Sequence, residues 1–260
     1  MHQIKILQSV IGTLLEGGRG VTGTATPLQP EKAIQLYEKE GCPFCRRVRE
    51  VLTLLNLDVE VYPCPKNGTR FRPVAEEMIK SMGGTVSFPL MVDQNTGEKL
   101  QESQAIIDYL FKNYGKTGKT PTKWKNLSKQ PIMGRLISGV RLMHGLKADS
   151  TNINKAAPTT LLHLWSFEAS PFSRLVRERL CELELPYVLH NVAKERWQDM
   201  GPAVFRAKPG PYEPLAGGKR EKELSNMQGR LQVPYLVDDN TGVQMFESKD
   251  IIQYLNRTYG

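Results

Sequence analysis

The chain has 260 residues, of which 40% are hydrophobic, enough for one large domain or for two small ones with cores of their own. Its net charge is +8, but the basic residues are scattered and accompany no nucleic-acid motif, so nucleic acid is not an expected partner. Four cysteines are too few for a disulfide scaffold, and no apolar run approaches the roughly 20 residues of a transmembrane segment.

The first thirty residues are predicted to form a helix followed by a linker. Ile4, Leu7, Ile11 and Leu14 recur at helical spacing, which indicates an amphipathic helix. Residues 17–30 are rich in glycine, threonine and proline and are typical of a flexible linker. The helix is expected to cover a domain surface, and a membrane-surface or partner-binding helix is the alternative.

From residue 36 onward, the same blocks of sequence occur twice. One copy begins LYEKEGCPFCRRVREVL at Leu36, and the other begins LWSFEASPFSRLVRERL at Leu164. Each copy later carries an X-Pro step, an Asp-X-Asn-Thr-Gly stretch and a Glu-Ser pair, in that order. This pattern predicts a tandem duplication with divergence, in which the second copy carries an insertion within about residues 194–229. The basic residues of that insertion are expected in a solvated loop, or in a loop over a pocket.

Each copy is predicted to fold as β-α-β, a middle segment, and β-β-α. Short apolar runs indicate strands, and Pro43 and Pro171 are expected in the first turn of a helix. Ser103 and Ser248 are expected to cap the last helix of each copy. The order indicates an α/β chain of two thioredoxin-like modules with extra connecting helices. The predicted domains are 1–30, 31–115, 116–160 and 161–260; within 116–160, apolar residues at 132–143 again recur at helical spacing.

Cys42 and Cys45 have the spacing of a redox or metal-binding pair. At a helix N-terminus, unpaired backbone N–H groups and the helix dipole stabilise a thiolate. We expect the positive charges of Lys39, Arg46 and Arg47 to lie near Cys42 and to stabilise its thiolate further. Cys45 should be more buried and placed to attack a mixed disulfide on Cys42. No second cysteine pair exists to complete a zinc site, so no metal is expected; an iron–sulfur cluster held by Cys42 with glutathione is an alternative.

Three motifs of the first copy resemble known glutathione-binding families. Gly-Cys-Pro-Phe-Cys, with Lys39 three residues before the first cysteine, resembles a glutaredoxin. Phe88-Pro89 resembles the X-Pro element of glutaredoxins and glutathione transferases, whose proline is cis, and Glu102-Ser103 resembles the Glu-Ser pair of the glutathione-transferase N-terminal domain. Cys-Pro-Phe-Cys combined with Glu-Ser most resembles omega-class transferases. The resemblance implies glutathione as co-substrate, Cys42 and Cys45 as catalytic residues, and a binding site made of Lys39, Phe44, Phe88, Pro89, Glu102 and Ser103.

The second copy replaces both thiols with Ser170 and Ser173, so it cannot perform dithiol exchange. Ser170-Pro-Phe resembles the start of plant tau-class transferases, where a serine binds the glutathione thiol. The resemblance implies a second glutathione site, and a degenerate copy kept for packing is the alternative. The site would consist of Ser170, Phe172, Val233, Pro234, Glu247 and Ser248.

Taken together, the resemblance implies a glutathione-dependent thiol–disulfide oxidoreductase that acts on glutathionylated or disulfide substrates. A carrier of glutathione or its conjugates with little catalysis is the alternative. Transferases supply their acceptor site from an all-helical domain, which a second module replaces here, so conjugation of electrophiles is not expected. Similar plant proteins with two such domains imply a chloroplast location, with the cytoplasm as the other reducing compartment. Association of the chain into homo-oligomers is compatible with the sequence.

Overall fold

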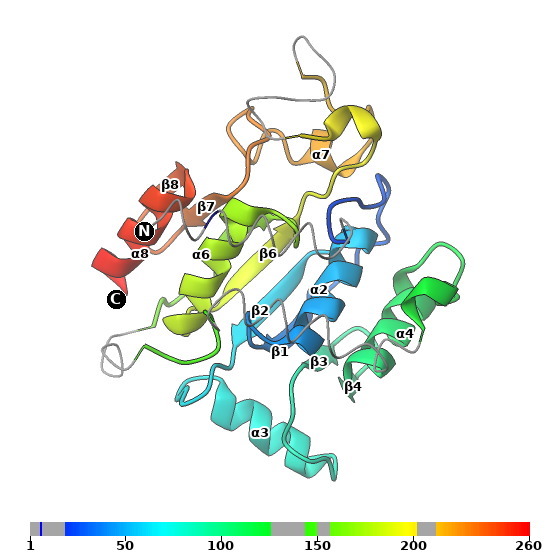
Figure 1. Cartoon of the computed structure of the whole chain (residues 1–260), viewed down its shortest axis with the longest axis vertical. Coiled ribbons are helices and arrows are strands. Elements are labelled where there is room, and N and C mark those ends of the chain that lie inside the picture. The colour runs from blue at the N-terminus through cyan, green and yellow to red at the C-terminus, as the bar shows by residue number, and fades with distance from the viewer. Residues whose placement is uncertain (1–5, 7–18, 126–143, 150–156, 202–211) are drawn as a thin grey trace.

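The computed structural model describes residues 6, 19–125, 144–149, 157–201 and 212–260. Their strands form one eight-stranded sheet in the order β4-β3-β1-β2-β6-β5-β7-β8, with four strands from each half of the chain (Figure 1). The amphipathic segments predicted at 4–15 and 132–143 lie outside the described residues, apart from Ile6. The domain limits proposed from the sequence stay a prediction.

The first half has the predicted β-α-β and β-β-α arrangement. Strand β1 runs parallel to β2 and antiparallel to β3, and β4 is antiparallel to β3. Helix α2 packs against α4. The middle segment, which the sequence left unassigned, contains helix α3. The elements are β1 (Ile34–Glu38), α2 (Pro43–Leu55), β2 (Val59–Pro63), α3 (Arg72–Ser81), β3 (Leu90–Asp93), β4 (Glu98–Gln101) and α4 (Ser103–Tyr114), followed by the 3-10 turn η1 (Thr122–Trp124).

The second half has the same strand pairings, and α6 packs against α8. Both halves therefore have the thioredoxin-like fold that the sequence predicts. The described residues of the insertion, 194–201 and 212–229, contain a 3-10 turn and a short helix. The elements are β5 (Leu162–Ser166), α6 (Pro171–Glu182), β6 (Tyr187–Asn191), η4 (Trp197–Asp199), α7 (Lys219–Lys222), β7 (Tyr235–Asp238), β8 (Val243–Phe246) and α8 (Ser248–Thr258).

Two basic residues of the insertion are buried, so the expectation of a solvated loop is wrong for them. Lys219 and Arg220 are 4% and 5% exposed. Lys219 donates to the carbonyl of Asn56 at 3.0 Å and pairs with Asp58. Arg220 donates to the carbonyl of Val192 at 2.7 Å. Burial of both cations is tolerated because oxygen acceptors replace their water, and it attaches α7 to the rest of the chain.

The two halves join through their outer strands. Strand β2 pairs antiparallel with β6, and the aligned residues Glu60 and Val188 face each other at the centre of the pairing. On either side, Val59 faces Leu189 and Val61 faces Tyr187. The contact is therefore isologous, as in a two-fold symmetric dimer. It also removes one exposed edge from each four-stranded unit, and such edges favour aggregation.

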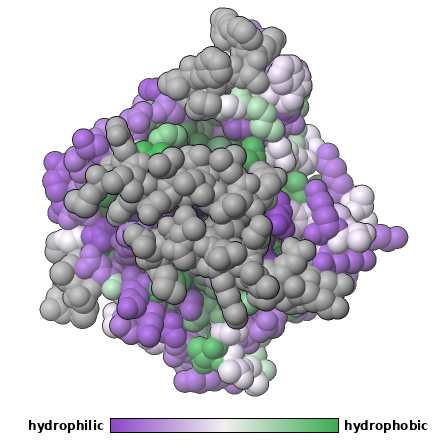
Figure 2. Space-filling model, viewed as in Figure 1, coloured by the Kyte–Doolittle hydropathy of each residue, from purple (hydrophilic) through white to green (hydrophobic). Residues whose placement is uncertain are grey.

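One hydrophobic cluster extends across this junction. It contains side chains of both halves, among them Leu57 and Val61 from the first and Leu180 and Tyr187 from the second. Helices α2 and α6 lie in front of the sheet in the view of Figure 1. The described part of the face in Figure 2 is largely hydrophilic, with hydrophobic residues in small patches. No helix among the described residues has the length and hydropathy to cross a membrane.

Candidate functional site

The Cys42 thiol lies at the N-terminus of helix α2, where the sequence places it. Cys42 occupies the N-cap position in an extended conformation, and Pro43 begins the helix. Cys42 is 8% exposed, whereas Cys45 is fully buried. The Sγ of Cys42 lies 3.9 Å from the carbonyl oxygen of Phe88, whose bond to Pro89 is cis. The fold thus brings together the Cys-X-X-Cys motif and the X-Pro element, which are 46 residues apart in the sequence.

The surroundings of Cys42 favour its thiolate. A hydrogen bond from the Cys45 thiol, assisted by the backbone N–H groups of Cys45 and Phe44 and by the charge of Lys39, lowers the pKa of Cys42 to about 6 despite its burial. Burial raises the pKa of Cys45 well above its usual range. At neutral pH the pair therefore consists of one thiolate and one thiol, which is the division of roles needed for exchange.

Two cations lie near the ring of Phe88, whose carbonyl oxygen is close to the Cys42 sulfur. The Nζ of Lys39 lies 5.2 Å from the ring centroid, and the guanidinium carbon of Arg72 lies 5.4 Å from it. Arg72, the first residue of α3, was missed at the sequence level, because its charge alone did not distinguish it from other arginines. Arg46, which we expected near Cys42, instead lies 3.6 Å from the carboxylate of Glu168 in the other half.

Glu102 and Ser103 open helix α4, but not as predicted. Glu102 is the N-cap residue, with a left-handed φ of 74°, and Ser103 is the first residue of the helix. The aligned Glu247 has a φ of 68° and precedes Ser248 in the same way. The prediction that the serines are the caps is therefore wrong, because backbone torsion at the glutamates cannot be read from residue type. Ser103 is half-buried and Glu102 is exposed.

The hydroxyl of Ser87 donates to Glu102 Oε1 at 3.4 Å, which connects the X-Pro loop to the Glu-Ser pair. The side chain of Gln101 donates to the Ser87 hydroxyl at 2.7 Å. These contacts bring Phe88, Pro89, Glu102 and Ser103 to the same end of the sheet as Cys42. Phe44, also predicted for this site, lies on α2 with 40% of its surface exposed. No sequence signal pointed to Ser87 or Gln101.

In the second half, Ser170 takes the position of Cys42 at the start of α6. Its Oγ accepts hydrogen bonds from the backbone N–H of Ser173 at 3.3 Å and from the Ser173 hydroxyl at 2.8 Å. Because both lone pairs of the Ser170 oxygen accept hydrogen bonds, the hydroxyl proton of Ser170 can be donated to another acceptor. The bond between Val233 and Pro234 is cis, as in the first half.

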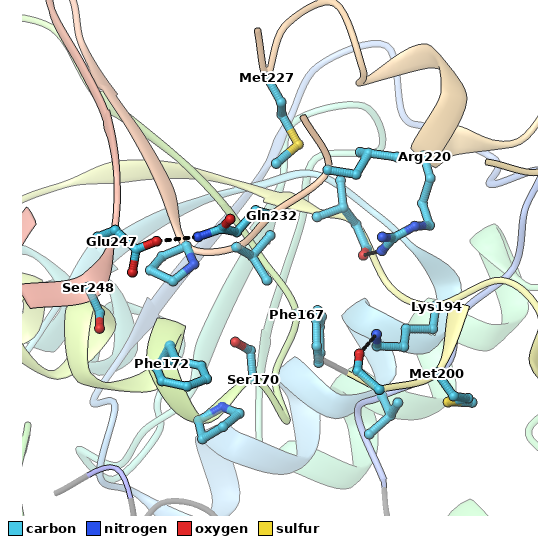
Figure 3. A pocket seen from close by; sticks show the side chains of 17 residues that line it. Phe167, Ser170, Phe172, Lys194, Met200, Arg220, Met227, Gln232, Glu247 and Ser248 are labelled. Carbon is cyan, nitrogen blue, oxygen red and sulfur yellow. Dashed lines mark hydrogen bonds between the residues drawn. The ribbon is translucent and has the colours of Figure 1, made fainter. Parts of the chain in front are cut away.

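A cavity of about 570 Å³ adjoins Ser170 (Figure 3). This volume is in the range of small-molecule sites. All the residues predicted for the second site line it. Figure 3 shows Ser170 between the side of the cavity with Glu247 and Ser248 and the side with Phe167, Lys194 and Met200. The predicted residues that line it are Ser170, Phe172, Val233, Pro234, Glu247 and Ser248.

A network of buried charges connects the turn before α2, which holds Cys42, to the turn before α6, which holds Ser170, and the sequence did not reveal it. Arg49 of α2 donates to the Glu168 carboxylate at 2.9 Å, and the aligned Arg177 of α6 donates to the Glu40 carboxylate at 3.2 Å. Each arginine also binds the backbone carbonyl of the glutamate in its own half, at 2.9 and 3.1 Å. Glu40 and Glu168 each precede the nucleophile position by two residues, so these ion pairs hold both turns.

The acids of this network differ in protonation. Burial would raise the pKa of Glu168, but the surrounding arginines, first Arg177 and Arg49, hold it well below its usual range. Glu38, which also pairs with Arg49, has its pKa raised to about 8 because burial outweighs the arginine charge. Glu38 aligns with Ser166, so the first half contributes Glu38 and Glu40 to this network, whereas the second half contributes Glu168. The repeated Glu-X-Cys or Glu-X-Ser spacing could have pointed to the network.

Among the described residues, one group combines the side-chain types and spacing of a metal site: Asp58, His190 and Glu223. Protein partners already bind its ligand atoms. Asp58 pairs with Lys219 and lies 3.2 Å from His190 Nδ1, whose Nε2 contacts His163 at 3.0 Å. Glu223 accepts from the Trp165 indole at 2.9 Å. A metal cation that bound to Asp58 here would have to displace the ammonium group of Lys219.

The pKa of Cys42 can be measured by its rate of alkylation. In the wild-type protein, the rate with iodoacetamide should rise with pH through about 6 and level off above it, because the thiolate is the nucleophile. Cys45→Ser keeps a hydroxyl donor and should leave this profile close to wild type. Cys45→Ala removes the donor and should move the midpoint upward. Identical profiles for the two variants would contradict the role assigned to the Cys45 hydrogen bond.

Comparisons with known proteins show which family the chain belongs to. The family model described as glutathione S-transferase, N-terminal domain, matches residues 36–119 and 164–260, which together exceed half the chain. No curated protein matches the sequence. TDR1, a trimeric glutathione transferase from Leishmania, is similar in structure at 14% identity and a TM-score of 0.27, over 88% of this chain and 67% of that one. Because the TM-score of that likeness is low, the assignment relies on the match of the family model to the sequence: the chain belongs to the glutathione S-transferase N-terminal domain family.

Proposed function

We propose that this protein is a glutathione-dependent thiol–disulfide oxidoreductase that uses Cys42 as its nucleophile. The observation that carries the proposal is the Cys42 thiol at the N-terminus of α2, with a lowered pKa and 3.9 Å from the carbonyl of Phe88. A transferase that activates glutathione alone needs a hydrogen-bond donor to its sulfur, whereas an ionised protein thiol is itself a nucleophile. The first half supplies an ionised protein thiol, that of Cys42.

The exchange proceeds in two steps. The Cys42 thiolate attacks the glutathione sulfur of a mixed disulfide, so that a Cys42–glutathione disulfide forms and the substrate leaves as a thiolate that takes a proton from water. The thiolate of a second glutathione then attacks that disulfide, which releases oxidised glutathione and regenerates the Cys42 thiolate. Each turnover consumes one free glutathione: the substrate sulfur is reduced to a thiol, and the glutathione released from the substrate leaves joined to the incoming one as glutathione disulfide. Cys45, held as a thiol, offers an intramolecular alternative to the second step.

The neighbours of Cys42 suit an anionic peptide. Lys39 and Arg72 provide positive charge 5.2 and 5.4 Å from the centre of the Phe88 ring, and the carbonyl oxygen of Phe88 lies 3.9 Å from the attacking sulfur. Glutathione carries two carboxylates, so both cations favour its approach. Ser103 and the N-terminus of α4 are proposed to bind its γ-glutamyl carboxylate, since N–H groups at a helix start favour anions. We propose the omega-like class for this half.

The activity is tested with a glutathionylated peptide as substrate and reduced glutathione as reductant, followed by the consumption of NADPH by added glutathione reductase. We expect turnover that saturates with the peptide and depends on glutathione. The absence of turnover above the uncatalysed rate would contradict the proposal. A peptide carrying a mixed disulfide with cysteamine, which lacks the carboxylates, should react more slowly if the cations act as we propose.

For the second half, we propose glutathione binding without dithiol chemistry. The support is the cavity at Ser170, lined by all the residues that the tau-class resemblance implies. Duplication of one ancestral module, of the type found in plant proteins with two such domains, accounts for the aligned motifs. A chloroplast location follows from the same resemblance, and imaging of the full chain fused to a fluorescent protein in plant cells would test it.

A further inference from the structure

A short arm of the chain, residues 144–149, lies beside the turn that holds Cys42. There the N–H of Gly41 donates to the carbonyl of Gly145 at 3.3 Å. A Cβ on Gly41 would come within 2.6 Å of the carbonyl oxygen of His144, so only glycine allows the arm to approach so closely. The arm comes from the segment between the two halves and is built into the surroundings of the Cys42 thiol.

The arm brings one lysine next to another. Lys147 faces Lys66, the third residue after β2, in a parallel bridge. The N–H of Lys66 donates to the carbonyl of Leu146 at 2.7 Å, which fixes this pairing. Both lysines are exposed, and neither forms an ion pair with a carboxylate among the described residues. Like charges on facing residues are destabilising, so the pair favours an anion that neutralises it.

The equivalent arm, residues 19–24, lies beside the turn before α6 in the second half. There Thr22 forms the parallel bridge with Lys194, the residue that aligns with Lys66. The Nζ of Lys194 donates to two backbone carbonyls, one of them that of Gly201 at 2.7 Å. The fold therefore does not require a lysine on the arm. Of the two equivalent bridges, the one with paired lysines is beside the thiol.

The lysine pair and the glutathione motifs lie on opposite sides of Cys42 in the sheet. Cys42 follows β1, which has β3 as one neighbour and β2 as the other. The X-Pro step precedes β3 and the Glu-Ser pair follows β4, so both motifs are on the β3 side. Lys66 follows β2, which is parallel to β1 and therefore ends at the same edge of the sheet as the thiol. If glutathione occupies the β3 side, the β2 side is left for the polypeptide from which it is removed.

We propose that Lys66 and Lys147 form a docking surface for polypeptide substrates with acidic residues next to the glutathionylated cysteine. Two ammonium groups without carboxylate partners complement the charge of glutamate or aspartate side chains, and they disfavour lysine or arginine at the same positions. This inference rests on the proposed thiol exchange at Cys42 and names the class of substrate on which that exchange acts.

The test compares two glutathionylated peptides that differ only in the residues flanking the cysteine, which are glutamate in one peptide and glutamine in the other. An exposed ion pair changes an equilibrium constant up to about fivefold, so two lysines should make kcat/KM about three- to tenfold higher for the glutamate peptide. Raising the salt from about 0.1 M to about 1 M shortens the Debye length from about 10 Å to about 3 Å and should remove most of this preference. Equal kcat/KM values at low salt would overturn the inference.

Lys66→Glu tests the lysine pair without weakening the fold. It places opposite charges on the two sides of the bridge, so the variant should be at least as stable in urea as the wild type. Lys147→Glu should act in the same way, and in either variant the ratio of kcat/KM for the two peptides should fall to about one. Lys66→Arg should keep the preference. Lys116→Glu, in the exposed turn after α4, changes the net charge equally and should leave the ratio unchanged. A preference that survives both glutamate variants would overturn the inference.

The KM for glutathione separates docking of the substrate from binding of glutathione. Lys66→Glu should leave it unchanged, because the glutathione motifs lie on the β3 side. An increase in this KM that is the same with both peptides would assign the lysines to glutathione and overturn the inference.

Binding to the Cys42→Ser variant separates the docking surface from the chemistry. The two glutathionylated peptides, labelled with fluorescein, are titrated with this variant and followed by fluorescence anisotropy. Tighter binding of the glutamate peptide, combined with no turnover in the wild type, would support the docking surface and refute the oxidoreductase proposal. Turnover without any preference for the glutamate peptide would refute the docking surface and support the oxidoreductase proposal.

Discussion

Arg49→Leu should lower the free energy of unfolding by about 3–5 kcal/mol, the cost of removing one member of a buried ion network. Arg49 is 1% exposed and contacts three carboxylates, those of Glu38, Glu40 and Glu168. Without the guanidinium, these acids lose their main compensating charge in a site that water does not reach. The loss also frees the Cys42 turn, since Arg49 donates to the carbonyl of Glu40.

The measurement is equilibrium unfolding in urea, monitored by tryptophan fluorescence. Arg179→Leu is the matched control, because Arg179 pairs with Asp149 at 2.8 Å but is 18% exposed, and exposed pairs contribute about 1 kcal/mol or less. Arg49→Lys should fall between the two, since lysine keeps the charge but cannot donate to several acceptors in one plane. An Arg49→Leu variant as stable as Arg179→Leu would show that the network contributes little to stability.

Cys42→Ser should reduce the thiol-exchange activity on the order of 10³-fold or more in kcat/KM. A serine hydroxyl stays protonated at neutral pH and forms no disulfide, so the first step of the exchange is lost. The position is otherwise preserved, because Ser170 occupies the same N-cap place in the second half. The measurement is the coupled assay with a glutathionylated peptide.

Cys45→Ser is the control for that variant. It retains the nucleophile and a hydrogen-bond donor to it, so glutathione can still resolve the mixed disulfide; at least about a tenth of the activity should remain. If Cys45→Ser is as inactive as Cys42→Ser, the intramolecular dithiol route is obligatory. Full activity in Cys42→Ser would refute the assignment of the nucleophile.

The local parts of the site could be predicted from the sequence. A cysteine before a helix-starting proline must lie near the first N–H groups of that helix, so the position of Cys42 and the burial of Cys45 followed from spacing alone. The X-Pro and Glu-Ser elements were placed by their order among predicted strands and helices. Where torsion decided the outcome, prediction failed: Glu102 and Glu247, not the serines, hold the N-cap positions.

Contacts between distant residues could not be predicted in this way. The pairing of Arg49 with Glu168 and of Arg177 with Glu40 depends on how the halves meet, and nothing in either copy alone fixes that arrangement. Arg72 reaches Phe88 only because α3 ends up beside the X-Pro loop. Lys219, expected in solvent, became buried against Asp58 of the other half.

The sequence by itself determined the two thioredoxin-like units, the thiol pair in one and its loss in the other, because hydrophobic periodicity and turn residues act over short distances along the chain. Only the tertiary structure decided that β2 and β6 merge both units into one sheet, that buried arginines connect the turns before α2 and α6, and that the thiol-free half has a cavity lined largely by apolar side chains. The first two features arise from edge pairing and side-chain packing between segments more than a hundred residues apart, and the cavity arises from packing of the insertion and Val21 around the start of α6; residue order alone specifies none of these contacts.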